Sequence, residues 1–505
     1  MQPDRTEAKR FVAVLGVIRE NSNQVKNVLE TLGASLPIAA GDRSARLIDL
    51  LSSAIALGLL QTGDKLPPEN QLADMLDVSI PTLREALAEL RADGVIETRR
   101  GRGGGSFLVD SPQNWQQRGA RLLERYSVAD IRDLGDEASA LLGRAAGLAA
   151  ERANAADLRR LKDMLRRARE ATSEDQAAIN NSRFHIELAV ISQSMYLTQA
   201  TVQMQSRLAP LLRASPRSSA RVDGTHRAHE EIVEAIQMRR VQRATALAGG
   251  HLDAAIGKII TDKMATLPHV GQRGVEQVAV EFEDFFTDLS TFLEAKASQL
   301  AGLAGAESES ERTLTSIHAH ATATLDRFES AAGAGPIFDA SPEGQDGDCL
   351  YWWVRSAPGL YERRLMDTVA GTEKFYDFRS NPWFQQAQER RVPVLQGPYI
   401  DYLGYDAYLV TVTAPMLGTG GEFYGVFGAD LELGSLERAF LPLLGSVPGR
   451  ELVLADASAR VILSSSSRWS SGQRVDQALP GWSVVPLAPE SLGLQVFHRE
   501  AQAQA

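Results

Sequence analysis

The sequence predicts a multidomain protein: a small helical domain closed by a β-hairpin, an all-α helical bundle, and an α+β domain that begins with a long helix. Three observations lead to this fold class. Short helical patterns precede a glycine- and arginine-rich hairpin in residues 41–112. Apolar residues recur at helical spacing, with few prolines, in residues 125–265. Aromatic, glycine and β-branched residues dominate after residue 333.

Bulk properties narrow the possible classes. A chain of 505 residues is long enough for about three domains. The net charge of −11 argues against a generally basic nucleic-acid binder, so any DNA contact requires a local patch and a specific motif. The single cysteine, Cys349, excludes an internal disulfide framework and favours the cytoplasm. No apolar run approaches the ~18 residues of a membrane span, so we expect no membrane association.

The first domain follows an N-terminal helical extension, residues 1–40, to which we assign no chemistry. Its pattern predicts one helix from Ser44, a second opening at Glu69, and a third that follows the N-cap Ser79 and begins with Pro81. Two strands then flank a glycine-rich tip. This is the order of a winged helix-turn-helix, in which the third helix fits the major groove and the basic wing contacts the backbone.

The residues predicted to contact DNA lie on the third helix and the wing: Ser79, Thr82, Arg84, Arg99, Arg100, Arg102 and Gly103. The alternative is a three-helix scaffold with a solvated basic hairpin. The motifs Leu66-Pro-Pro-Glu69, Val78-Ser79 and Leu83-Arg-Glu-Ala-Leu87, with the glycine-rich wing, resemble the winged helix of GntR-family regulators. The resemblance covers about 65 residues and implies a homodimer on an inverted-repeat DNA operator.

Two positions depart from that family's pattern. Ile80 and Asn70 stand where the family usually has arginine. Two expected DNA contacts are therefore missing, which changes the expected operator sequence but not the fold.

The second domain, residues 125–265, has an all-helical pattern with the motifs Phe184-His185, His229-Glu-Glu-Ile-Val-Glu-Ala-Ile236 and His251-Leu252. With these motifs it resembles the all-helical FCD effector domain of FadR-type regulators. Asn181 and His185 lie four residues apart and so share a helix face, while His229 and His251 follow at separations of 44 and 22 residues. The resemblance implies that these four residues bind a divalent metal ion. Three imidazoles suit Zn²⁺ first, with Ni²⁺ or Mn²⁺ as alternatives, and an open position could accept a ligand carboxylate.

This ligand set also departs from the family. Asn181 occupies the usual carboxylate position, and an amide oxygen is a weaker, uncharged donor. Ser139 and Gly143 replace the Arg and Glu common on the domain's first helix. The alternative reading is buried, hydrogen-bonded histidines without metal. A metallohydrolase is not favoured, because no His-Glu-x-x-His motif is present, and we expect no enzyme activity.

In the third domain, residues 270–495, a long predicted helix precedes the motifs Tyr376-Asp-Phe-Arg-Ser-Asn-Pro-Trp-Phe384, Gly397-Pro-Tyr-Ile-Asp401 and Gly425-Val-Phe-Gly-Ala-Asp430. With these motifs the domain resembles a Cache (PAS-like) ligand sensor, here expected to sample the cytoplasm. We predict a mixed sheet and a frayed tail after about residue 490. The candidate ligand-binding residues are Tyr376, Arg379, Trp383, Tyr399, Asp401 and Asp430. Aromatic faces with two carboxylates suit an ammonium group, so an amine is favoured and an amino acid is the alternative. In another reading these aromatics are core and the aspartates are turn residues.

Together these features predict a ligand-responsive DNA-binding transcription regulator of the GntR type. Small-molecule effectors in the FCD-like domain and in the Cache-like domain would set its affinity for double-stranded operator DNA. The alternative is a ligand-binding signalling adaptor that has lost sequence-specific DNA binding, which the residues Ile80 and Asn70 would explain.

Overall fold

The computed structural model describes residues 43–501, except 59, 61, 77, 102, 110–120, 122, 172, 215–218, 269, 303–310, 341–348, 358, 369–371, 373–374, 402–406 and 476–480. The predicted extension, residues 1–40, and Arg102 lie outside this part. Two compact units emerge. The first holds the described residues up to Tyr126 and Asp130–Lys263, and the second holds Ser127–Ala129 and the described residues from Met264 onward.

The winged helix comprises α3 (Arg43–Ala56), α4 (Glu69–Met75), α5 (Ile80–Ala92), β1 (Ile96–Arg99) and β2 (Gly105–Leu108). The two strands pair antiparallel, with Ile96 opposite Leu108 and Arg99 opposite Gly105. Leucines and alanines of the three helices form one buried core, which includes Leu51, Leu72, Leu83 and Leu87. Apolar spacing therefore places these helices as the sequence predicted.

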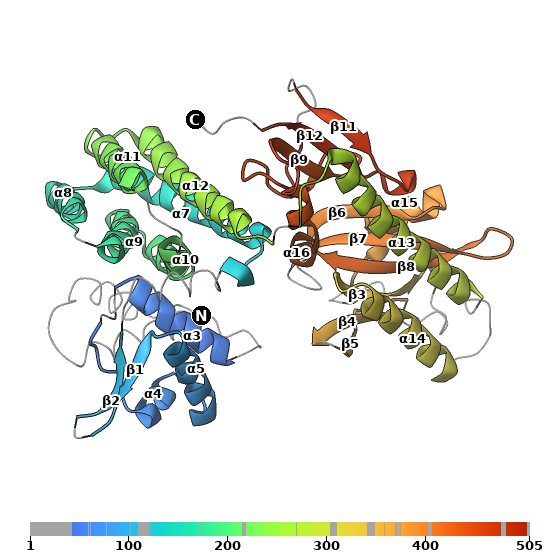
Figure 1. Cartoon of the computed structure of the whole chain (residues 1–505), viewed down its shortest axis with the longest axis horizontal. Coiled ribbons are helices and arrows are strands. Elements are labelled where there is room, and N and C mark those ends of the chain that lie inside the picture. The colour runs from blue at the N-terminus through green and yellow to red at the C-terminus, as the bar shows by residue number, and fades with distance from the viewer. Residues whose placement is uncertain are drawn as a thin grey trace. The chain divides into compact units, whose positions relative to one another are not determined.

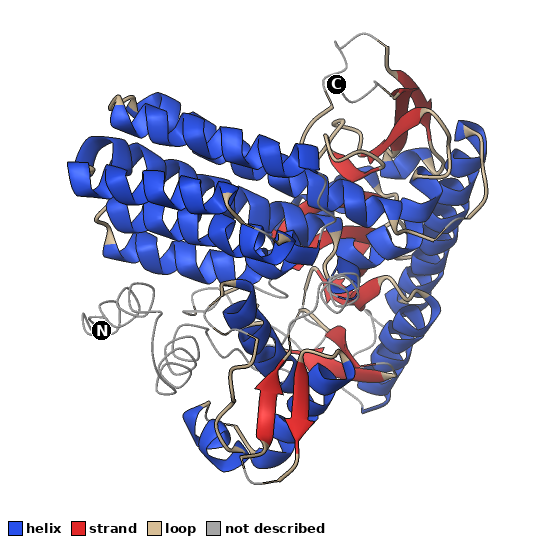
Figure 2. Ribbon diagram, turned by 60° about the vertical axis from the view of Figure 1, so that its left-hand side comes forward, coloured by secondary structure: helices blue, strands red, loops and turns tan. Residues whose placement is uncertain are grey.

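The helical bundle comprises α7 (Val128–Arg152), α8 (Ala155–Arg169), α9 (Glu174–Ile191), α10 (Met195–Ala214), α11 (Ser219–Gln237) and α12 (Val241–Ala265). Its long helices run alongside one another (Figure 2). The winged helix packs directly on this bundle, because α3 lies against α10 (Figure 1). Ile186, Val202 and Ala209 of the bundle belong to the same apolar cluster as the winged-helix core.

The second unit begins with α13 (Val275–Ala301) and α14 (Glu311–Arg327), which pack on a six-stranded sheet. The strand order is β5-β4-β3-β8-β7-β6, with β3 (Ala331–Phe338), β4 (Trp352–Ala357), β5 (Leu360–Arg364), β6 (Val394–Asp401), β7 (Ala407–Leu417) and β8 (Phe423–Glu432). The short α15 (Pro382–Arg390) packs against β6, β7 and β8. All described pairings in this sheet are antiparallel, so the predicted mixed sheet is wrong.

A second, smaller sheet follows α16 (Leu433–Leu444). It has the order β10-β9-β12-β11, with β9 (Arg450–Ala455), β10 (Val461–Ser464), β11 (Ser483–Pro486) and β12 (Gln495–Glu500). The predicted frayed tail is wrong, because β12 pairs with both β9 and β11 and extends past the predicted boundary at 495. Within the described ranges, no helix combines the length and the hydropathy needed to cross a bilayer.

Candidate functional site

The front of α5 carries three of the predicted DNA-contacting residues. Ser79 Oγ caps the helix, because it accepts a hydrogen bond from the Thr82 backbone N–H at 3.3 Å, and it lies 2.8 Å from the Thr82 hydroxyl. The Arg84 side chain is 66% exposed, and its Nε donates to Glu69 Oε2 at 2.8 Å. Arg91 Nη2 lies 3.8 Å from the other Glu69 oxygen. Glu69 therefore holds two α5 cations, a role that the sequence did not reveal.

The wing presents its cations around one aromatic ring. The Arg99 guanidinium lies 4.4 Å from the Phe107 ring centre, and its Nε donates to Glu97 at 2.7 Å. Lys65, which sequence reasoning missed, lies 5.7 Å from the same ring and donates to the Gly103 carbonyl at 3.1 Å. Arg100 is exposed at the end of β1. Gly105 has a φ of +147°, a backbone conformation that favours glycine.

The second candidate site is a histidine cluster inside the bundle. His185 of α9, His229 of α11 and His251 of α12 bring one ring nitrogen each to within 4.8 Å of one another. The Nε2 atoms of His229 and His251 are 3.2 Å apart, as are those of His251 and His185. His185 and His229 are buried, and the His229 ring stacks on Phe184 at 4.0 Å. The three predicted histidines therefore meet at one point.

Burial keeps these imidazoles neutral. It lowers the pKa of His185 and of His229 well below the usual value, and the neighbouring histidines lower both further. Burial also lowers the pKa of His251 to about 4. Neutral imidazole is the form that binds metal. Nitrogens bound tetrahedrally to one Zn²⁺ lie about 3.3 Å apart. The 3.2 Å separations fit that arrangement.

Two amide side chains accompany the histidines. Asn181 is buried on α9, one turn before His185. Gln205 of α10, which sequence reasoning missed, places its Nε2 2.8 Å from His185 Nδ1. The Gln205 Oε1 atom is buried without a hydrogen-bond partner. If the amide turned over, Oε1 would accept the Nδ1 proton of His185 and leave Nε2 of that ring as a ligand.

The third candidate site is a pocket beside β6, β7, β8 and α15. Five of the six predicted sensor residues line it together. Its full lining is Ile337, Leu350, Trp352, Met366, Tyr376, Trp383, Tyr399, Asp401, Thr411, Thr413 and Asp430. The cavity volume is about 30 Å³. A ligand of amino-acid size therefore enters only if lining side chains move.

A chain of hydrogen bonds runs through this pocket. The Tyr399 and Thr411 hydroxyls are 2.6 Å apart, and the Thr411 hydroxyl donates to Asp430 Oδ1 at 2.6 Å. Burial and the nearby carboxylates of Asp401 and Asp430 raise the pKa of Tyr376 and of Tyr399. Both phenols therefore keep their protons at neutral pH and present hydroxyl groups.

Arg379 does not line the pocket. Its Nη2 donates to the Asp339 carbonyl, its Nε lies 3.4 Å from Asp339 Oδ1, and its guanidinium lies 4.4 Å from the Phe378 ring centre. Arg379 lies within a 3-10 turn, Phe378–Ser380, and the sequence could not show that this turn would direct its side chain away from the pocket. The charged groups among the described lining residues are the carboxylates of Asp401 and Asp430.

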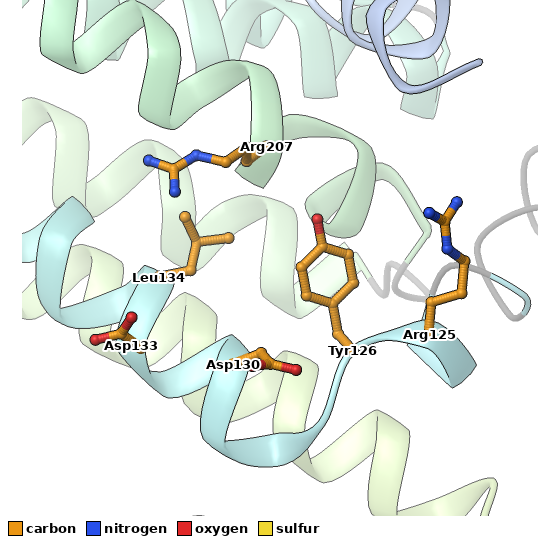
Figure 3. A pocket seen from close by; sticks show the side chains of 6 residues that line it. All are labelled: Arg125, Tyr126, Asp130, Asp133, Leu134 and Arg207. Carbon is orange, nitrogen blue, oxygen red and sulfur yellow. The ribbon is translucent and has the colours of Figure 1, made fainter. Parts of the chain in front are cut away.

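A further pocket lies on the first unit, away from the predicted residues. It has a volume of about 310 Å³ and is lined by Arg125, Tyr126, Asp130, Asp133, Leu134 and Arg207. Asp130, Asp133 and Leu134 project from α7, and Arg207 projects from α10 (Figure 3). Arg207 also pairs with Glu137. This mixture of opposite charges follows no sequence motif, which is why the sequence did not indicate it.

Two solved structures that are similar to parts of this chain share little sequence with it. The amino-acid chemoreceptor ligand-binding domain PctC of Pseudomonas aeruginosa, in complex with GABA, is 14% identical with a TM-score of 0.31, covering 45% of this chain and 95% of that one. A GntR protein of Streptococcus agalactiae is 22% identical with a TM-score of 0.21, covering 42% and 98%.

Curated relatives match less than half of the chain. The putative HTH-type transcriptional regulator RmpR of Mycobacterium gastri is 40% identical over 226 residues, which span 44% of this chain and 82% of that protein. The HTH-type transcriptional regulator LutR of Bacillus subtilis is 29% identical, over 39% of this chain and 91% of its own length.

Family models match all three predicted domains. Residues 43–105 match the bacterial regulatory proteins of the gntR family, and residues 138–254 match the FCD domain. Residues 317–438 match the first PDC sensor domain of methyl-accepting chemotaxis protein-like sequences. These matches confirm the prediction of a winged helix, a helical FCD-like bundle and a Cache-like sensor. The chain therefore belongs to the GntR family of regulators and combines its winged helix and FCD domain with a PDC sensor domain.

Proposed function

We propose that this protein is a transcription regulator whose affinity for operator DNA is set by small molecules. The packing of the winged helix on the helical bundle carries the proposal. Ser53 Oγ of α3 donates to the Ser206 carbonyl of α10 at 2.7 Å, and Arg183 of α9 donates to the Gly58 carbonyl at 2.8 Å. Ser206 and Arg183 lie within two residues of Gln205 and His185, so a change at the histidine cluster reaches α3 through these neighbours.

The DNA partner is double-stranded and is read in the major groove by α5, with the wing on the backbone. The exposed Arg84, Arg99 and Arg100, together with Lys65, support this role. As in other two-fold regulators, a homodimer would bind an inverted repeat. A bacterial protein with this role works in the cytoplasm, where the DNA lies.

The histidine cluster is proposed to bind one divalent metal ion. Its three neutral imidazoles and 3.2 Å nitrogen separations suit Zn²⁺ first, with Ni²⁺ or Mn²⁺ as alternatives. Asn181 would supply a fourth, uncharged donor. The ion would order α9, α11 and α12 about one point and offer a coordination position to an anionic effector.

The PDC pocket is proposed to take an amine, with an amino acid as the alternative. Trp383, Tyr376 and Tyr399 supply aromatic faces, while Asp401 and Asp430 supply negative charge. Because Arg379 pairs with Asp339 outside the pocket, the described lining holds no cation for a ligand carboxylate. This favours an amine over an amino acid.

A mobility-shift assay separates this function from that of a signalling adaptor without sequence-specific DNA binding. The full chain is titrated onto the DNA upstream of its own gene and onto shuffled DNA, over a series of salt concentrations. We expect preferential binding of the upstream DNA, with affinity that falls as salt rises. Equal, weak binding to both DNAs would favour the adaptor, and Arg84→Ala serves as the matched loss-of-contact variant.

A further inference from the structure

Ile80 is an exposed aliphatic side chain at the front of the recognition helix. It is the first residue of α5 and is 40% exposed. It lies outside the apolar cluster that forms the winged-helix core. Arg84 follows four residues later, so the two side chains share one face of α5. An isolated exposed isoleucine is common on proteins, but this one stands at the end of the helix that enters the groove.

The polar groups around Ile80 already have partners within the protein. Ser79 Oγ caps α5 and contacts the Thr82 hydroxyl, and the Arg84 guanidinium pairs with Glu69. Ile80 has no polar atom to offer a base or a phosphate. Its one favourable interaction in the groove is the burial of apolar surface.

The major groove offers one apolar feature, the C5 methyl group of thymine. We propose that Ile80 reads a thymine by packing against this methyl group. The proposal rests on the proposed DNA-binding function and adds a specificity-determining residue to it. It also gives a role to Ile80, which stands where the GntR pattern usually has arginine. The isoleucine does not simply remove a polar contact but replaces it with a methyl contact.

Uracil substitution tests the methyl contact directly, because uracil differs from thymine only by that methyl group. A preferred duplex is first selected from a randomised pool with the full chain. Each thymine of that duplex is then replaced singly by uracil. We expect one thymine per bound α5 at which uracil weakens binding about 4-fold, as the loss of one buried methyl requires.

The same series is measured with Ile80→Ala, Ile80→Val and Met238→Ala. Ile80→Ala should bind the thymine and uracil duplexes equally at that position, while Ile80→Val, which keeps a methyl branch, should retain most of the discrimination. Met238 is also an exposed apolar residue, 49% exposed, but lies in the helical bundle, so Met238→Ala should behave as the parent.

The outcomes separate two failures. If the pool yields no preferred duplex, the proposed DNA-binding function fails. If a duplex is selected but every uracil replacement leaves affinity unchanged, or if Ile80→Ala keeps the full uracil effect, sequence-specific binding stands and the role of Ile80 is overturned.

Discussion

At the scale of single residues, the ion pair between Glu69 and Arg84 bears on the proposed DNA contact of Arg84. The Arg84 and Glu69 side chains are 66% and 37% exposed, so their ion pair contributes at most about 1 kcal/mol to stability. The Glu69 carboxylate pairs with the Arg84 guanidinium, and in the proposed complex it would also bring negative charge close to the DNA phosphates. Positioning and repulsion act together at this one site, so binding selectivity is a better readout than stability.

We expect Glu69→Gln to bind random DNA more tightly and to discriminate the preferred duplex less. The variant loses a charge that repels phosphate and loses the partner that orients Arg84. Arg84→Ala should lose about 1–3 kcal/mol of binding to the preferred duplex only, if Arg84 reads a base. Competition binding with both DNAs measures the ratio. An unchanged ratio in Glu69→Gln would mean that the ion pair does not position Arg84.

The histidine cluster gives a second test at this scale. Three neutral imidazoles and an amide leave the two positive charges of a bound metal ion uncompensated. Asn181→Asp adds a carboxylate one turn before His185, so it should bind Zn²⁺ at least tenfold more tightly in competition with a chromophoric chelator, since one added charge interaction of about 1.4 kcal/mol suffices.

The controls for this metal test are His185→Ala, His229→Ala and His251→Ala, each of which should abolish stoichiometric uptake. A parent protein that takes up no Zn²⁺, Ni²⁺ or Mn²⁺ on incubation would contradict the metal assignment. The histidines would then be buried core residues that hydrogen-bond to Gln205 and to one another.

The sequence predicted the histidines of this cluster but not the residues that contact the candidate sites through packing. The resemblance to the FCD domain was enough to assign His185, His229 and His251 to one proposed centre, while helical spacing alone joined only Asn181 and His185. Gln205, Glu69 and Lys65 were missed because each meets its partner through tertiary packing, and no spacing rule records such contacts. Arg379 was assigned to the sensor pocket from its place in a motif, yet Asp339, 40 residues earlier, holds it outside.

At the scale of elements, the connection after α3 determines how the winged helix sits on the bundle. Gly58 has a φ of +66°, and a Cβ there would lie 2.6 Å from Ile179 Cγ2 of α9. Gly63 also has a positive φ, +90°, but a Cβ there meets nothing within 4 Å. The two glycines therefore share a backbone requirement and differ in the space around them.

We expect Gly58→Ala to destabilise the protein more than Gly63→Ala does. Both changes carry a backbone cost of order 1 kcal/mol, while Gly58→Ala adds a steric clash that moves α9 or α3. Denaturant midpoints of the two variants give the difference. Equal losses would show that the contact between Gly58 and Ile179 yields without cost, and would weaken the proposed route from the histidine cluster to α3.

Elements differed in how well the sequence indicated them. The helices of the winged helix and the bundle follow from local apolar periodicity. The last strand, β12, did not, because its six residues look like a polar tail until they pair with β9, whose partner residues lie at least 40 positions earlier. Strand pairing is non-local, so the antiparallel order of both sheets was also beyond the sequence.

At the scale of the whole molecule, the chain carries two kinds of candidate sensor besides its DNA-binding domain. The histidine cluster suits a metal ion, and the PDC pocket, with Asp401 and Asp430, suits a cation of a different kind. The two sites lie in different compact units. A ligand for one should therefore be recognisable without the other, which allows the PDC pocket to be tested in the intact chain.

We expect an amine to raise the melting temperature of the intact protein, since a ligand that binds only the folded state stabilises it by about 2.7 kcal/mol at a hundredfold excess over Kd. Asp430→Asn should remove the gain because it cancels a charge that holds the ammonium group and disturbs the bond from Thr411. Trp383→Ala should reduce it by removing an aromatic face. His251→Ala, in the other unit, is the matched control and should keep the gain.

Amines, amino acids and simple carboxylates are screened side by side. Stabilisation by carboxylates alone, unchanged in Asp430→Asn, would mean that a cation such as Arg379 moves into the pocket and that the aspartates do not define its ligand.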